Sequence, residues 1–389
     1  MHGKITLRKN EERRIVKGHL WVFSNEIQTI ESTIQSGDLV EVLSSEGKSL
    51  GVGFYNKRSL IAVRMLSKTA QELETIITAK VREAYALRKT LYPTRDSYRL
   101  IYSEGDFLPG LIVDKYGDTG VLQFNSLGVY LHRELIADVL VREVGFKNLF
   151  TKNDNYFLGL EGIPEGDFVL RGELVNLKFS DGSITYNISP TDSQKTGFYF
   201  DQSDNRYFVE RIVKDADVLD CFSNVGGFGM HALKAGAQSV VFNDSSETVL
   251  TQAKNHLVEN GLSGKTEFIV SDTFDLLERF IAEKKMFDVV MIDPPAFIKN
   301  KKSLITGRKA YEKLNRDAIN VVEPGGYLVT SSCSYHLSEP EFYEAVRNAS
   351  GKAGKTLQLI WSNSASLDHP RHPFMEESQY LKFAVYRVM

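Results

Sequence analysis

Short apolar runs separated by turn signals predict a β-rich segment at the start of the chain. Gly37-Asp38 and Glu46-Gly47 are typical turn pairs between such runs. The expected strands are Lys4–Leu7, Leu39–Leu43, Leu50–Tyr55 and Leu60–Met65. Residues 1–68 are therefore predicted to form a small β-barrel.

A helical spacing of apolar residues begins after this segment. It runs from Thr69 to Leu91, and Pro93 ends it. Strand-like runs then flank one helical stretch, Tyr130–Val144. Residues 69–188 thus predict a connector helix and a middle α/β domain. The expected strands are Tyr98–Tyr102, Gly110–Lys115, Gly120–Phe124, Asn148–Thr151, Asp167–Leu170, Leu174–Phe179 and Ser183–Ile188.

Strands and helices alternate over residues 189–389. This alternation predicts an α/β domain with a mostly parallel, doubly wound sheet and one antiparallel strand near its end. Tyr311–Val321 is an expected helix, which Pro324-Gly325-Gly326 ends. The expected strands are Val218–Leu219, Ser239–Asn243, Glu267–Val270, Phe287–Ile292, Tyr327–Ser331, Thr356–Ser362 and Tyr380–Arg387.

A glycine-rich turn follows the first strand of this sheet. The stretch Asp217–Gly229 has the sequence DVLDCFSNVGGFG, and a helix is expected from about Met230. Such a turn lets the backbone approach a nucleotide cofactor, and the helix end offers free amides. An ordinary tight turn is the alternative. The pattern is not G-x-G-x-x-G, so a nicotinamide enzyme is only a distant alternative.

Acidic residues follow three further strands of the predicted sheet. Asp244 comes about twenty residues after the glycines, where a carboxylate suits a ribose diol. Asp272 suits an adenine amino group, and Asp293 precedes Pro294-Pro295. Because the carboxyl ends of parallel strands share one edge, these side chains are expected to face one ligand.

Longer motifs resemble one known family. These are SPTDSQKTGFYFDQSDNR (Ser189–Arg206), DPPAFIKNKKSL (Asp293–Leu304), SSCS (Ser331–Ser334) and DHP…ESQYLK (Asp368–Lys382). They resemble the class I, S-adenosylmethionine-dependent 23S rRNA cytosine-5 methyltransferases that contain a PUA domain. The segments GHLWVFSNEI and GDLVEVLSSEGKSLGVGFYN resemble the PUA module, an RNA-binding barrel. The resemblance covers nearly the whole chain and implies a Rossmann-like methyltransferase domain over residues 189–389.

The resemblance implies a site for S-adenosylmethionine. Its methionine end would lie against Asp220 and Gly226, its ribose against Asp244 and its adenine against Asp272. The candidate cofactor-binding residues are Asp220, Phe222, Gly226, Gly227, Asp244, Asp272, Asp293, Lys195, Phe198 and Gln202. Core packing is an equal interpretation of the Phe198 ring. Asp201 and Arg206 are not counted among the candidate site residues, because a helix cap or a surface ion pair explains each of them equally well.

Cys333 is the candidate nucleophile. Carbon 5 of cytosine needs a thiolate at carbon 6 before it can attack a sulfonium methyl group. Cys333 stands just past a strand end at the ligand edge, although a small buried apolar residue is the alternative. In the resembling family, Asp293 contacts the pyrimidine and stabilises its protonated ring nitrogen; a strand-end cap is the alternative. Cys221 is expected to pack under the glycine turn.

One departure from the family pattern leaves part of the mechanism open. Many RNA cytosine-5 methyltransferases carry a second cysteine after the proline of this motif, whereas this chain has Ala296 after Pro295. The base that removes the carbon 5 proton therefore stays unidentified. A guanine-modifying rRNA methyltransferase, in which Cys333 is dispensable, is one alternative. A non-catalytic RNA-binding protein with a degenerate methyltransferase domain is another.

Composition limits the partners, metal sites and cellular location that can be expected. The 389 residues are 42% hydrophobic and 25% charged, with a net charge of −3, so any RNA contact must come from local patches. Two cysteines argue against a disulfide framework or a multi-cysteine metal site, and no metal is expected. No apolar run has the length of a membrane span, which favours the cytoplasm. RNA, in particular large-subunit rRNA, is the expected partner, and a homodimer is left open. The basic patches are Lys4, Arg8, Lys9, Arg13, Arg14 and Lys17, and Lys299, Lys301, Lys302, Arg308 and Lys309.

Overall fold

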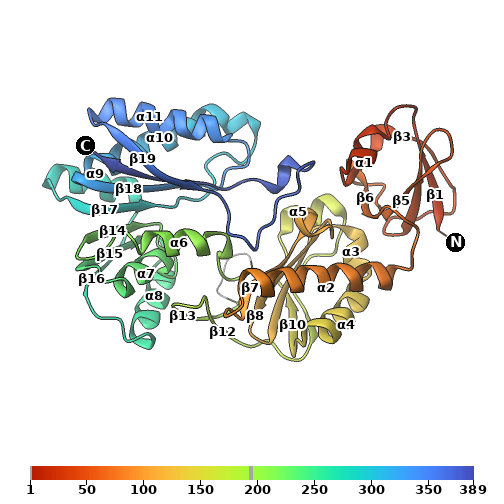
Figure 1. Ribbon diagram of the computed structural model, residues 1–389, viewed down its shortest axis with the longest axis horizontal. Helices are drawn as coiled ribbons and strands as arrows, with labels where there is room; N and C mark the ends of the chain where they lie inside the picture. The colour runs from red at the N-terminus through yellow and green to blue at the C-terminus, as the bar shows by residue number, and fades with distance from the viewer. Residues whose placement is uncertain (1, 192–195) are drawn as a thin grey trace. The chain divides into compact units, whose positions relative to one another are not determined.

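The N-terminal residues form a six-stranded sheet in the order β2-β6-β5-β4-β1-β3. The computed structural model describes residues 2–191 and 196–389 (Figure 1). All pairs in this sheet are antiparallel except β1 with β4, and alternate side chains such as Ile5, Val42 and Val63 are fully buried. The strands are β1 (Gly3–Leu7), β2 (Trp21–Phe23), β3 (Ile27–Ile30), β4 (Leu39–Leu43), β5 (Ser49–Tyr55) and β6 (Ile61–Ser67), with helix α1 (Arg13–Lys17) after β1.

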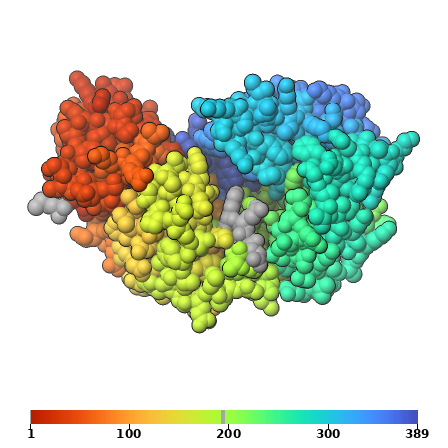
Figure 2. All heavy atoms as spheres, turned by 180° about the vertical axis from the view of Figure 1, so that it is seen from behind, coloured from red at the N-terminus to blue at the C-terminus, as the bar shows by residue number. Residues whose placement is uncertain are grey.

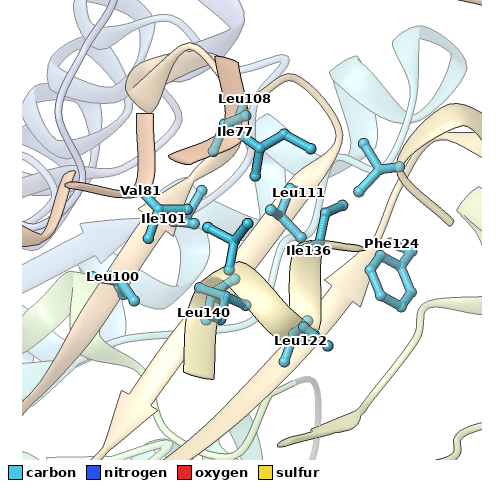
Figure 3. Close-up of a cluster of buried hydrophobic side chains, with 14 of the residues drawn as sticks. Ile77, Val81, Leu100, Ile101, Leu108, Leu111, Leu122, Phe124, Ile136 and Leu140 are labelled. Carbon is cyan, nitrogen blue, oxygen red and sulfur yellow. The ribbon is translucent and has the colours of Figure 1, made fainter. Parts of the chain in front are cut away.

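A second sheet follows in the order β11-β10-β9-β8-β7. Its strands are β7 (Ser97–Tyr102), β8 (Leu111–Tyr116), β9 (Thr119–Phe124), β10 (Asn148–Thr151) and β11 (Val169–Arg171). Helices α2 (Leu73–Leu91) and α4 (Arg133–Val144) bury one apolar stripe each against this sheet. Figure 3 shows that core, with Ile77 and Val81 of α2 and Ile136 and Leu140 of α4 beside strand residues such as Leu122.

Two local features of this region differ from the sequence prediction. The single helix expected at Tyr130–Val144 is two helices, because α3 (Leu127–Leu131) ends at His132, whose Nδ1 lies 2.8 Å from the carbonyl oxygen of Gly128. An unpredicted helix, α5 (Asn155–Glu161), begins where Asp154 accepts a hydrogen bond from the Tyr156 amide.

The chain forms two compact units. The first comprises residues 1–181, 187–200 and 368–378, and the second comprises residues 182–186, 201–367 and 379–389. Strands β12 (Leu177–Ser180) and β13 (Thr185–Ile188) form a two-stranded sheet where the chain first passes from one unit to the other. The three predicted domains, 1–68, 69–188 and 189–389, stay a prediction.

The second unit contains a seven-stranded sheet in the order β16-β15-β14-β17-β18-β20-β19. The first five strands in this order are parallel, and β20 is antiparallel to both of its neighbours. The predicted doubly wound α/β sheet with one antiparallel strand is therefore confirmed. The strands are β14 (Asp217–Cys221), β15 (Ser239–Asp244), β16 (Lys265–Val270), β17 (Phe287–Ile292), β18 (Val322–Ser332), β19 (Leu357–Asn363) and β20 (Lys382–Val388).

Helices cover both faces of this sheet (Figure 1). One face packs against α9 (Thr273–Glu283), α10 (Leu304–Asn320) and α11 (Glu339–Ala353). The other packs against α6 (Ser203–Val209), α7 (Gly227–Lys234) and α8 (Glu247–Glu259). Figure 2 shows the outer surface from the other side, with most of the second unit in green, cyan and blue. Since both faces are buried, polar side chains that serve chemistry must stand at the strand ends.

None of the helices in the described part of the chain is long and apolar enough to cross a lipid bilayer.

Candidate active site

The glycine turn after β14 is tightly wound. Phe222 and Asn224 adopt left-handed backbone conformations, with φ of 58° and 48°, and Gly226, at φ 86°, caps the N-terminus of α7. A left-handed conformation strains a residue that has a side chain, so this turn is stabilised by its surroundings. Helix α7 begins at Gly227, at the sheet edge where β14 ends.

Asp220 lies under this turn. Its Oδ2 accepts a hydrogen bond of 2.8 Å from the Gly229 amide, and its side chain is almost fully buried. Burial raises the pKa of Asp220 to about 7, although the Gly229 hydrogen bond acts in the opposite direction. Asp220 therefore fixes the start of α7 as well as standing at the predicted cofactor edge.

Asp244 and Asp272 stand at the ends of the next two strands. The two oxygens of Asp244 accept hydrogen bonds from the amides of Asn224 and Ser246, both at 3.0 Å, so Asp244 joins the glycine turn to β15. Asp272 is exposed and caps α9, with its Oδ1 2.7 Å from the Phe274 amide. A carboxylate oxygen has two lone pairs, so these contacts leave acceptor sites for hydroxyl or amino groups of a nucleoside.

Asp293 follows β17 at the centre of the sheet. Its Oδ1 accepts hydrogen bonds from Gln202 Nε2, at 2.9 Å, and from the Ser331 hydroxyl. Among the described residues, none donates a hydrogen bond to Oδ2. Burial raises the pKa of Asp293 to about 6 in spite of the Ser331 hydrogen bond. This carboxyl group can therefore hold or release a proton near neutral pH.

The SSCS motif places Cys333 beside Asp293. Ser331 bonds to Asp293, and the half-buried Cys333 thiol donates to the carbonyl oxygen of Pro294, at 3.7 Å. Ser334 Oγ accepts from the Ile298 amide at 3.1 Å and lies 2.9 Å from the Tyr311 hydroxyl. The loop after β18 is thus tied to the loop after β17.

Neighbouring strands each contribute one polar or nucleophilic side chain to this edge. Across the sheet order these residues are Asp272, Asp244, Asp220, Asp293, Cys333 and Lys382, from β16, β15, β14, β17, β18 and β20. Sequence reasoning found all of them except Lys382. The signal for Lys382 was its position as the first residue of an antiparallel strand, which begins where its parallel neighbours end.

The structure places the remaining candidates in different surroundings. Gln202 lies in the second unit and contacts Asp293, as described above. Phe198 is buried in the first unit, where its ring packs against Phe179 and Phe200 at centroid distances of 5.0 and 5.4 Å. This is the core packing that the sequence left open. Lys195 lies outside the described residues.

Two basic residues differ from the sequence expectation. Arg206 is not a surface residue: it is buried in α6, and its positive charge lowers the pKa values of Asp220 and Asp293 against the larger effect of burial. Arg308 forms ion pairs with Glu341 and Glu344 at 3.4 and 2.8 Å. The exposed cations that follow Asp293 are therefore Lys299, Lys301, Lys302 and Lys309.

These residues fit a nucleoside-containing sulfonium cofactor. The acids suit hydroxyl and amino donors, and the α7 N-terminus offers amides to a carboxylate. Ser223 Oγ, in the glycine turn, is buried without a hydrogen-bond partner among the described residues. Buried polar atoms normally have a hydrogen-bond partner. A ligand that forms a hydrogen bond with Ser223 Oγ would therefore remove the free-energy cost of burying this atom without one.

Two family models match the chain. A PUA-like domain matches residues 5–68, and a family described as conserved hypothetical protein 95 matches residues 176–347. The first match lies on the N-terminal six-stranded sheet and confirms the predicted PUA-like fold there. The second includes the glycine turn and the loops that carry Asp293 and Cys333.

A solved structure shares the fold over nearly the full length. It is SMU.776, described as a candidate methyltransferase complexed with SAH, and it is 21% identical. The TM-score is 0.84, and the match covers 99% of each chain. This likeness confirms the class I methyltransferase fold.

Curated relatives match the whole chain at higher identity. Ribosomal RNA large subunit methyltransferase I of Alteromonas mediterranea is 33% identical over 394 residues, covering 100% of this chain and 99% of the relative. The protein of the same name from Pseudoalteromonas atlantica is 34% identical, with 100% coverage of both. Together with the fold, these relatives confirm S-adenosylmethionine as the cofactor. The chain belongs to the ribosomal RNA large subunit methyltransferase I family.

Proposed function

We propose that this protein methylates carbon 5 of a cytosine in large-subunit ribosomal RNA, with Cys333 as the covalent nucleophile. The observation that carries this proposal is the contact between the Cys333 thiol and Pro294, the residue next to Asp293. The candidate nucleophile therefore contacts the residue that follows the candidate acid, at the ligand edge of the sheet. Covalent catalysis at a pyrimidine requires that pair.

Each of the two side chains has one task. The thiolate of Cys333 adds to carbon 6, and the ring electrons move toward nitrogen 3. Asp293, with a pKa raised to about 6, delivers its proton to that nitrogen as the sulfur–carbon bond forms. Gln202 and Ser331 both hold Oδ1, which leaves Oδ2 to carry the proton.

The cofactor supplies an electrophilic methyl group on a sulfonium sulfur. The candidate residues that would hold it are Asp220, Phe222, Gly226, Gly227, Asp244 and Asp272. Asp293 stands at the same edge of the sheet as this site and Cys333, and the cofactor roles of Gln202, Phe198 and Lys195 stay predictions. After methyl transfer a base must remove the carbon 5 proton, and the electron pair released breaks the sulfur–carbon bond and frees Cys333. That base is not assigned to any residue.

A cavity in the first unit supports RNA as the substrate. It has a volume of about 580 Å³ and combines apolar and aromatic walls with Lys17, Lys68 and Lys80. Phe107 and Phe374, at its border, are 42% and 50% exposed. Exposed rings beside lysines suit an unpaired base and its flanking phosphates.

The test uses ribosomal RNA that lacks modifications, methyl-labelled S-adenosylmethionine and digestion to nucleosides. We expect label in 5-methylcytidine, and none with Cys333→Ala. Cys221→Ala is the matched control, because Cys221 is fully buried in the core and should be dispensable for the reaction. Label in a guanosine that Cys333→Ala leaves undiminished would refute the thiol mechanism. A protein that does not bind S-adenosylmethionine in titrations would be a degenerate domain.

A further inference from the structure

Lys382 is a buried cation next to the proposed nucleophile. It is the first residue of β20, its Cα pairs with that of Ser332, and the residue is only 5% exposed. The ammonium group donates to the carbonyl oxygens of Ser334, at 2.6 Å, and Tyr380, at 2.7 Å. These two bonds fix the charge beside the loop that carries Cys333.

No carboxylate among the described residues forms an ion pair with Lys382. The acidic residues that face it come from α11, and both are engaged elsewhere. Glu341 accepts from the Ser338 hydroxyl at 2.8 Å and pairs with Arg308, while Glu339 accepts from the Tyr343 hydroxyl. An ammonium group has three donors, and two are used by carbonyl oxygens here. Burying an ammonium group without a charged partner is costly, and lysines are almost never fully buried unless they are paired.

The electrostatics of the site give Lys382 a natural counter-charge. Burial lowers the pKa of Lys382 to about 8, and Cys333 is the strongest of the groups that raise it, ahead of Glu339 and Glu341. A negative charge on the Cys333 sulfur therefore favours the ammonium form of Lys382, which the two carbonyl oxygens also stabilise. By the same interaction, the positive charge of Lys382 favours the thiolate form of Cys333 over the thiol form.

We propose that Lys382 is a positioning residue that keeps Cys333 in its thiolate form. The S–H bond breaks, the proton leaves to water, and the sulfur anion remains beside the ammonium group, with no change of oxidation state. The inference deepens the proposed function, since a thiolate is the form that adds to carbon 6. It also supplies the activation that the cytosine reaction requires of its nucleophile.

Alkylation by iodoacetamide tests this without RNA or cofactor. The rate is followed against pH by mass spectrometry of the peptide that contains Cys333. Cys221 serves as an internal control, because it is fully buried and burial raises the pKa of its thiol. The variants are Lys382→Met, which removes the charge, and Lys382→Arg, which keeps it. Lys265→Met is the matched control: Lys265 also begins a strand of this sheet, but it is exposed and lies at the opposite edge.

We expect the wild-type thiol to titrate below the ordinary value of about 8.5. Lys382→Met should raise the apparent pKa by about one unit or more, so that alkylation at neutral pH slows by about tenfold. Lys382→Arg should retain part of the shift, and Lys265→Met should match the wild type. A wild-type profile with an ordinary thiol pKa would overturn the inference even if Lys382→Met failed to fold. So would an unchanged profile in a folded Lys382→Met protein.

The two proposals fail in different ways. If RNA is labelled at a base other than cytosine while the alkylation profile still depends on Lys382, the proposed reaction is wrong and the activated thiolate stands. If 5-methylcytidine forms but the profile ignores Lys382, the reaction stands and this inference is wrong.

Discussion

Asp293 can act as an acid at neutral pH because its environment opposes ionisation. Burial raises its pKa to about 6, and two donors on Oδ1 orient the group. Cys333 needs the opposite protonation state, since only the thiolate adds to the ring. Methyl transfer should therefore follow a bell-shaped pH profile, with one limb set by each residue.

Asp293→Asn keeps the shape of the side chain but cannot deliver a proton. We expect kcat for methyl transfer to fall by a factor on the order of 10²–10⁴. The matched control is Asp288→Asn, an exposed residue near the amino end of the same strand, whose acceptor role toward the Asp217 amide an asparagine can keep. A rate for Asp293→Asn within a few-fold of the control would exclude Asp293 as the acid.

The raised pKa of Asp220 leads to a prediction about the stability of the folded protein rather than about the rate of methyl transfer. Its pKa is about 7 in the folded chain, above the usual value near 3.8, so the folded state binds more protons than the unfolded state between these pH values. Its contribution to stability is fully present below pH 3.8 and is lost as pH rises through 7.

Asp220→Asn removes this dependence and can still accept from the Gly229 amide. The variant should therefore unfold at a higher temperature than the wild type at pH 8, and this advantage should shrink toward pH 4. Thermal unfolding at several pH values measures the difference. An advantage of the same size at every pH would show that ionisation of Asp220 is not its cause.

At the scale of the element, helix α7 depends on a close contact with β15. A Cβ atom added to Gly229 would lie 2.1 Å from Cε1 of Phe242, in the core between helix and sheet. Gly351, near the end of α11, is exposed and has no atom within 4 Å of the corresponding position. The two helical glycines therefore differ in packing.

Alanine substitutions separate these two cases. Gly229→Ala should destabilise the protein by about 1–3 kcal/mol through overpacking. Gly351→Ala should stabilise it by about 0.5–1 kcal/mol, because alanine is the better helix former. Denaturant unfolding measures both. If Gly229→Ala proved as stable as Gly351→Ala, α7 could move away from the sheet at little cost.

The local pattern of apolar and polar residues was sufficient to predict most helices and strands of the second unit. The strands that end at Asp244 and before Asp293 were predicted within a residue or two, because continuous apolar runs end there in acids. Other features depend on contacts that the pattern does not contain. The break at His132 comes from a side-chain contact inside the helical stretch, and α5 is only seven residues long. Lys382 reaches the site through pairing of β20 with β18, whose partner residues lie 50 to 60 positions apart in the sequence.

At the scale of the whole molecule, the local distribution of charge matters more for RNA binding than the net charge does. The net charge is −3, yet Lys299, Lys301 and Lys302 are exposed beside the loop that follows Asp293. A local cluster can contact RNA phosphates although the chain as a whole is acidic. Each contact releases counterions, so binding should weaken with salt.

Replacing Lys299, Lys301 and Lys302 together by glutamine should weaken RNA binding and reduce the slope of log affinity against log salt by about 1 for each lysine in contact. The matched control replaces Lys265, Lys284 and Lys285, which lie near the opposite edge of the sheet. Binding measured at several salt concentrations gives both slopes. Equal slopes for the two triple variants would place the RNA elsewhere.

The position of β20 in the sheet has a consequence for biosynthesis. This strand is made after every other strand of the unit, yet it lies between β18 and β19. Until residues 382–388 leave the ribosome, β18 has an open edge, and a strand edge without a partner invites pairing with other chains. The cation beside Cys333 arrives with the same strand. When β20 pairs with β18 late in synthesis, the nascent chain therefore covers the open edge of the sheet and places Lys382 beside Cys333 in the same step.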